Sequence, residues 1–212
     1  MRKQMLTVDQ LNALLRQILK NLEPVQVKGI ESDLQVYCDI QGAYGRGEFD
    51  DKFRENYKKF YQLHLLSTHL REGVTSETAE KKYFDLLKSQ KQSPLTFEGV
   101  LKTIFDEITG CWSGSFASKL VATADDMKAV LDKNVLGELQ ISHPSSGKKE
   151  VRCEKWIKTY DKVNDLYDTY LSSSEGKEFV KAFDKKLPGL KKLSSVKKID
   201  VLLWENKRQE NN

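Results

Sequence analysis

Apolar residues recur every three to four positions along most of the chain, which is the spacing of amphipathic α-helices. The clearest such segment is the first, where leucine and isoleucine repeat at helical spacing from Leu11 to Leu22. Thr7 and Gln10 stand before it in the arrangement of a capping box. The pattern as a whole predicts an all-α protein, a compact multi-helix domain of about eight to ten helices.

Prolines and glycines divide this pattern into segments. Pro24, Pro94, Pro144 and Pro188 fall between the periodic stretches, where proline ends helices. We expect helices over residues 76–90, 97–109, 116–124, 150–171 and 174–183, and from 195 onward. Asp125 or Asp126 is expected to cap a short helix that includes Val130 to Leu139. The polar tail after Trp204 is expected to fray.

Two segments leave alternatives open. Residues 25–47 fit either short strands or a helix, with a loop expected over Gly42–Gly47. After this loop, a long helix is expected to end near Gly73 and to carry an aromatic stripe from Phe49 to Phe60. The stripe could form part of the core, or it could bind a protein partner.

Length and composition limit the classes of protein that fit. A chain of 212 residues is long enough for one unit over 1–212, or for two apposed lobes over 1–95 and 96–212. A hydrophobic content of 39% with 31% charged residues is typical of a folded helical protein. No apolar run approaches the ~18 residues of a membrane span, and the start resembles no secretory signal, so we expect no membrane association.

Cysteine and histidine usage gives no sign of a metal or a cofactor. The cysteines Cys38, Cys111 and Cys153 are odd in number and form no CxxC pair, which favours reduced thiols and a cytoplasmic location. The three histidines also lack the spacing of metal ligands. We therefore expect no metal and no cofactor.

Positive charge gathers in the last third of the chain. Residues 145–212 hold 16 lysines and arginines against 11 acids, whereas the preceding residues hold 19 against 20. Such a basic region could lie against a polyanion such as nucleic acid. The alternative is ordinary solubilising charge on exposed helix faces.

Residues 97–124 have the layout of an element that binds a DNA backbone. One apolar helix runs into a turn bounded by Gly110 and Gly114, and a second helix follows. In such an element, backbone N–H groups of the turn and of the second helix point at a phosphate, which Ser115 and Lys119 could also contact. Trp112 could stack on a base or cover the core. The alternative is an ordinary turn between two helices.

The run Ser115–Leu120, SFASKL, followed by Asp132-x-x-Val135-Leu136, resembles the middle of the helix-hairpin-helix DNA glycosylase superfamily, and in particular a divergent bacterial branch of it. The resemblance covers about residues 97–140. It implies a helix-hairpin-helix-like element, double-stranded DNA as partner and a role in DNA repair. It also implies that Asp132 is the active-site carboxylate.

The chain departs from that family at two places. Three residues separate Gly110 from Gly114, where the family has one, and no lysine stands directly after the turn. Lyase chemistry therefore lacks its nucleophile, and a monofunctional glycosylase that uses Asp132 is the expected activity. The alternatives are a non-catalytic protein-interaction or nucleic-acid-binding module on the same scaffold, in which Asp132 is a helix cap or a surface residue.

Overall fold

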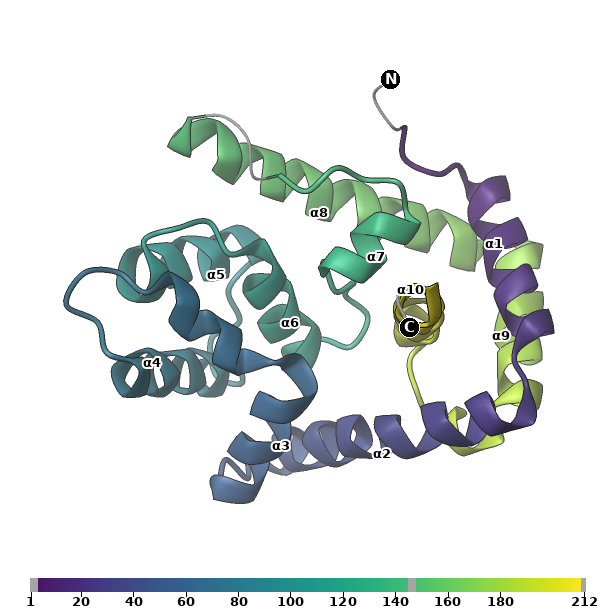
Figure 1. The fold of residues 1–212 in the computed structure, drawn as a ribbon, viewed down its shortest axis with the longest axis horizontal. Coiled ribbons are helices and arrows are strands. Elements are labelled where there is room, and N and C mark those ends of the chain that lie inside the picture. The colour runs from purple at the N-terminus through teal and green to yellow at the C-terminus, as the bar shows by residue number, and fades with distance from the viewer. Residues whose placement is uncertain (1–3, 145–147, 211–212) are drawn as a thin grey trace. The chain divides into compact units, whose positions relative to one another are not determined.

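The computed structural model of the protein describes residues 4–144 and 148–210, and every regular element in these ranges is helical (Figure 1). The α-helices are α1 (Val8–Asn21), α2 (Pro24–Arg46), α3 (Asp51–Tyr61), α4 (Ser76–Ser89), α5 (Phe97–Ile104), α6 (Gly114–Ala124), α7 (Lys133–Glu138), α8 (Lys149–Ser172), α9 (Ser174–Lys186) and α10 (Ser195–Glu210). Shorter segments are the 3₁₀ helices η1 (Leu63–His69) and η3 (Pro188–Leu190) and the π-helical η2 (Phe105–Thr109). The all-α fold is therefore confirmed.

The described residues form two compact units, and each unit is assembled from separate stretches of the chain. The first unit contains residues 4–34, 126–144 and 159–210, and the second contains 35–125 and 148–158. Helices α2 and α8 each supply residues to both units. These units do not coincide with the contiguous lobes 1–95 and 96–212 that the sequence suggested.

The first unit is built around α1, α9 and α10. Helix α1 packs against α9 and α10, and α7 packs against α10 (Figure 1). The predicted capping box is present, because the Thr7 side chain accepts a hydrogen bond from Gln10 N–H and the Gln10 side chain accepts one from Thr7 N–H. Leu11 and Leu15 are fully buried, as the helical spacing predicted.

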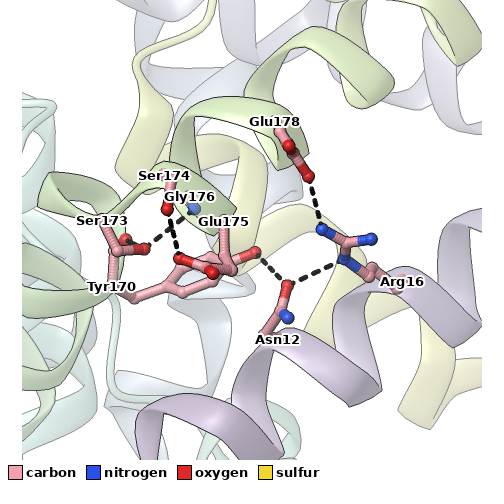
Figure 2. Close-up of polar contacts among 8 residues, drawn as sticks. All are labelled: Asn12, Arg16, Tyr170, Ser173, Ser174, Glu175, Gly176 and Glu178. Carbon is pink, nitrogen blue, oxygen red and sulfur yellow. Dashed lines mark hydrogen bonds and ion pairs between the residues drawn. The ribbon is translucent and has the colours of Figure 1, made fainter.

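The junction of α8 and α9 shows why α9 begins where it does. Ser173 is the N-cap, directly before the predicted start at residue 174, and its hydroxyl accepts the Gly176 N–H at 3.0 Å (Figure 2). A Cβ at Gly176 would lie 2.1 Å from the Tyr170 carbonyl oxygen, so only glycine lets the two helices meet this closely.

The second unit has an aromatic core. Phe53 and Tyr57 of α3 pack against Phe84 of α4 with ring centroids 6.1 and 5.5 Å away, and both α3 side chains are buried. The Tyr83 hydroxyl donates to the Phe116 carbonyl at 2.9 Å, which ties α4 to α6. Phe53 and Tyr57 at the centre of the stripe thus form core, whereas Phe49 and Phe60 at its ends are partly exposed. Binding of a protein partner by the stripe stays a prediction.

Two predictions failed where tertiary packing or backbone geometry overrides the local pattern. Residues 24–46 form one helix, which confirms the helical alternative, but the loop expected over Gly42–Gly47 is absent. The helix continues because Tyr37, Ile40 and Tyr44 bury one face of it, and Gly47, with φ +78°, ends it. The long aromatic helix stops early, because Gln62 takes the left-handed conformation at φ 52° and η1 follows.

Two further predictions failed near the chain's middle and end. Asp132 caps α7, as the alternative to a catalytic role expected, whereas Asp125 and Asp126, the caps predicted for this helix, lie outside any helix. The tail after Trp204 continues α10 to Glu210, with Glu205 buried. The sequence also predicts a loop over residues 143–147, of which residues 145–147 lie outside the described residues.

Candidate functional site

The turn between α5 and α6 belongs to the second unit. Helix α5 widens into η2, and the Gly110 N–H donates to the Phe105 carbonyl at 2.9 Å. Gly110 has φ +64°, a conformation that glycine adopts without steric cost. Arg71 lies against this end of the helix, since its backbone N–H donates to the Ile108 carbonyl at 3.0 Å.

Gly114 makes room for an aromatic ring. A Cβ on this residue would lie 2.2 Å from Cε3 of Trp156, a side chain of α8 that is only 2% exposed. The close approach that glycine permits here is therefore to the protein's own core. Gly114 is nevertheless the first residue of α6, so it also stands at the positive end of that helix.

Trp112 covers the core of the second unit. Its ring stacks on Phe105 with centroids 4.1 Å apart and planes 26° apart, and its Nε1 donates to the Lys149 carbonyl at 2.6 Å. Lys149 Nζ also lies 4.0 Å from the Phe105 ring centroid. One face of the Trp112 ring is thereby occupied by Phe105, and the indole N–H is satisfied.

Ser115 and Lys119 have structural partners. Ser113 precedes α6 as its N-cap residue, and its side chain makes no cap hydrogen bond. The Ser115 carbonyl accepts the Ser118 hydroxyl at 3.0 Å. Lys119 Nζ donates to the Tyr61 carbonyl at 3.1 Å and lies 5.4 Å from the Phe116 ring centroid, so this lysine links α6 to the end of α3.

Asp132 belongs to the first unit, where it is the N-cap of α7. Its Oδ1 accepts the Val135 N–H at 2.9 Å, and the residue is partly exposed. Within residues 4–144 and 148–210, no cation forms an ion pair with this carboxylate and no second hydrogen bond occupies it. The cap bond fixes the orientation of the side chain.

Sequence reasoning missed a second carboxyl group, Asp200 of α10, which is 3% exposed. Its Oδ2 accepts the Val130 N–H at 3.1 Å, and its Oδ1 accepts the Tyr167 hydroxyl at 3.2 Å. These bonds join α10 to α8 and to the segment before α7. The signal was available in the sequence, because helical spacing places position 200 on the same face as Val196, Ile199 and Leu203.

The two carboxyl groups act on each other electrostatically. Burial raises the pKa of Asp200 to about 7, Lys197 and the Val130 N–H oppose that rise, and the charge of Asp132 adds to it. Burial also raises the pKa of Tyr167 well above its usual value, and the charges of Asp200 and Asp132 raise it further. Asp132 therefore has a neighbouring acid whose protonation changes near neutral pH.

The structure thus separates the predicted residues into two groups. Gly110, Trp112, Gly114, Ser115 and Lys119 surround the turn in the second unit, whereas Asp132 joins Asp200 and Tyr167 in the first. An open hollow of about 450 Å³ lies between α3, η1 and α4, with Lys58 and Glu80 among its lining residues. None of the predicted site residues lines it.

No known protein family, curated protein or solved structure matches the chain. Within the ranges that the structure covers, no helix is both long and apolar enough to span a bilayer. The same residues contain no cluster of three or more histidine, cysteine or acidic side chains placed to hold a metal ion. The function is accordingly inferred from the carboxylates, the turn and the charges around them.

Proposed function

We propose that the protein binds double-stranded DNA and excises a base by hydrolysis, as a monofunctional glycosylase with Asp132 as its active-site carboxylate. The observation that carries this proposal is the state of Asp132: the carboxylate is partly exposed, bears no ion pair among the described residues, and is fixed by the 2.9 Å bond to Val135 N–H. A catalytic carboxylate needs this combination of fixed orientation and access.

The chemistry requires little besides that carboxylate. Cleavage of the glycosidic bond leaves positive charge on the sugar, and the base departs with the bonding electrons and takes a proton from solvent. The Asp132 carboxylate would stabilise the sugar cation, orient the water that attacks C1′ and accept its proton. Because no lysine directly follows the turn, the proposal includes no Schiff-base step. The base must leave the DNA stack to be reached.

The turn and its surroundings support DNA binding. Residues 110–113 lead into the positive end of α6, and Arg71 and Lys149 lie beside the turn through their contacts with Ile108 and Trp112. Backbone N–H groups and basic side chains of this kind bind phosphate without reading the base sequence. The exposed acids of η2 are partly offset, since Glu107 lies 3.6 Å from Lys82 Nζ.

An Asp132→Asn variant tests the catalytic role. Asparagine is as good an N-cap as aspartate, so the variant removes the negative charge and keeps the helix. We expect base release from duplexes carrying deaminated, alkylated or oxidised bases to fall at least ~100-fold, with duplex affinity retained. The measurement is strand cleavage at the abasic product after alkali treatment.

Asp50→Asn is the matched control. Asp50 caps α3 with the same geometry, its Oδ1 accepting the Phe53 N–H at 2.8 Å. This variant should release bases at the wild-type rate. Equal activity of Asp132→Asn and wild type, or no release by the wild type from any of these duplexes, would contradict the catalytic proposal.

A second candidate is a non-catalytic nucleic-acid-binding module. The observation that favours it is that residues of the turn and of α6 contact the protein itself. Trp112 stacks on Phe105, Gly114 lies against the Trp156 ring, and Lys119 donates to the Tyr61 carbonyl. Duplex binding by the wild type without release of any base would select this candidate over the glycosylase.

A further inference from the structure

Helix α9 carries three lysines in a row on its solvent face. Lys177, Lys181 and Lys185 are four residues apart, so they lie above one another along the helix, and all three are exposed. Phe179 and Phe183 are buried on the opposite face. These three lysines are hereafter the lysine row.

The acids of α9 are already engaged. Glu178 forms an ion pair with Arg16 of α1 at 2.7 Å (Figure 2), and Asp184 forms one with Lys198 of α10, also at 2.7 Å. Glu175 accepts the Ser174 hydroxyl at 2.8 Å.

The lysine row itself has no such partner. Among the described residues, no acid lies within ion-pair distance of Lys177, Lys181 or Lys185. Arg16 and Lys198 therefore pair with Glu178 and Asp184, and Glu175 is the one acid of α9 without an ion pair among the described residues.

Positive charge continues beyond the end of α9. Lys191 and Lys192 are exposed directly after η3, and Lys186 is partly exposed. One acid faces this end, since Glu31 accepts the Gly189 N–H at 2.8 Å. The surface from Lys177 to Lys192 thus presents several lysines against few unpaired acids, which is the charge pattern that a polyanion complements.

The spacing of the lysine row suits a nucleic-acid backbone. Four helical residues rise about 6 Å. The phosphates of one DNA strand recur about every 3.4 Å along the duplex axis, so every second phosphate lies about 6.8 Å further along it. Flexible lysine side chains absorb the difference. We propose that the lysine row binds the phosphate backbone of duplex DNA, an inference that rests on the DNA-binding part of the proposed function and assigns it a surface outside the α5–α6 turn.

An anionic membrane is the other polyanion such a row could meet. Helices that lie on membranes insert an apolar face between the lipids. The apolar face of α9 is instead packed within the first unit, where Phe183 is fully buried. The observations therefore favour DNA.

The test compares two triple variants of the full chain. Lys177→Gln/Lys181→Gln/Lys185→Gln removes the row, and Lys52→Gln/Lys81→Gln/Lys88→Gln removes the same charge from exposed positions on α3 and α4. Binding of a fluorescein-labelled, undamaged 20-bp duplex is measured by anisotropy between 50 and 200 mM NaCl. Circular dichroism establishes that both variants keep the wild-type helix content.

The row variant should bind the duplex about tenfold or more weakly at 100 mM salt. The magnitude of the negative slope of log K against log[salt] should decrease by about 2.7, because each lost phosphate contact removes about 0.9. The α3–α4 variant should keep a slope near that of the wild type. Equal effects of the two variants would overturn the inference, as would binding to phosphatidylserine vesicles in place of the duplex.

The outcomes also separate this inference from the catalytic proposal. If Asp132→Asn loses base release and the row variant keeps both base release and duplex affinity, the proposal that the lysine row binds DNA is overturned and the catalytic proposal stands. Loss of affinity in the row variant without base release by the wild type would overturn the catalytic role of Asp132 alone, and would leave the lysine row supported.

Discussion

At the residue scale, Gly114 shows how one amino acid can satisfy two different hypotheses. A glycine at the start of a helix after a turn is expected where a backbone approaches a phosphate. In the structure its missing Cβ leaves room for the buried Trp156 ring, with a would-be distance of 2.2 Å to Cε3. The sequence could not distinguish the two, because Trp156 lies 42 positions further along the chain and only folding brings it there.

Gly114→Ala should therefore lower the free energy of unfolding by about 2 kcal/mol or more, because a Cβ overlapping a buried ring forces the core to shift. The matched control is Gly29→Ala, in α2, where nothing lies within 4 Å of the added Cβ. It should be neutral or stabilising by up to ~1 kcal/mol. Urea unfolding measures both. If Gly114→Ala keeps its stability and loses only duplex affinity, the glycine serves phosphate and not packing.

At the element scale, some helix ends are set by local sequence signals and could be predicted. Others depend on backbone conformations or distant contacts that the local sequence does not show. The N-terminus of α1 was predicted because Thr7 and Gln10 are three residues apart and complete their capping box locally. The end of α3 was not predicted, because it depends on Gln62 at φ 52°, and no glycine marks this left-handed position in the sequence. Helix α10 is held by Asp200, whose partners on Val130 and Tyr167 are distant in sequence.

Asp200 makes a prediction about stability and pH. Its pKa is about 7 in the folded protein and about 3.9 in an unfolded chain, so the folded state holds the extra proton between these values. The contribution of this proton to the free energy of unfolding is fully present below pH ~4 and is lost as the pH rises through ~7. The loss is on the order of 4 kcal/mol. Asp200→Asn should flatten this decline in urea unfolding at pH 5 to 7.5.

Asp168→Asn, an exposed aspartate on α8, is the control and should keep the wild-type dependence. The lowered pKa of His143, which burial causes, gives a slope of the opposite sign in the same range. That contribution is common to all three proteins, so it cancels in the comparison. A decline that is as steep in Asp200→Asn as in the wild type would show that another group is responsible.

At the scale of the whole molecule, each unit draws on both halves of the chain. Helix α1 packs against α9 and α10, and α4 packs against η2. Both contacts cross residue 95, where the sequence suggested a division into lobes. Composition and periodicity could not reveal this interleaving, because they describe segments and not the pairing between them.

A chain divided after residue 95 should accordingly give two fragments that do not fold alone. Residues 1–95 lack the helices that cover Leu11 and Leu15, and residues 96–212 lack α1 and α4. Neither fragment should show a cooperative thermal transition by circular dichroism, whereas the intact chain should. A cooperative transition in either fragment would indicate that a contiguous lobe is an independent unit.

The sequence by itself determined that this protein is all-helical, where most helices lie, and that Asp132 stands apart as a carboxylate at the start of a short apolar segment. These properties follow from hydrophobic periodicity, caps and helix breakers, which act over a few residues. Only the tertiary structure decided that Gly114 faces Trp156, that Lys119 binds the Tyr61 carbonyl and that Asp200 is a buried neighbour of Asp132. It also decided that the lysine row forms no ion pair among the described residues. The reason is physical: burial, ion pairing and pKa depend on which distant segments meet, and that is set by packing of the whole chain.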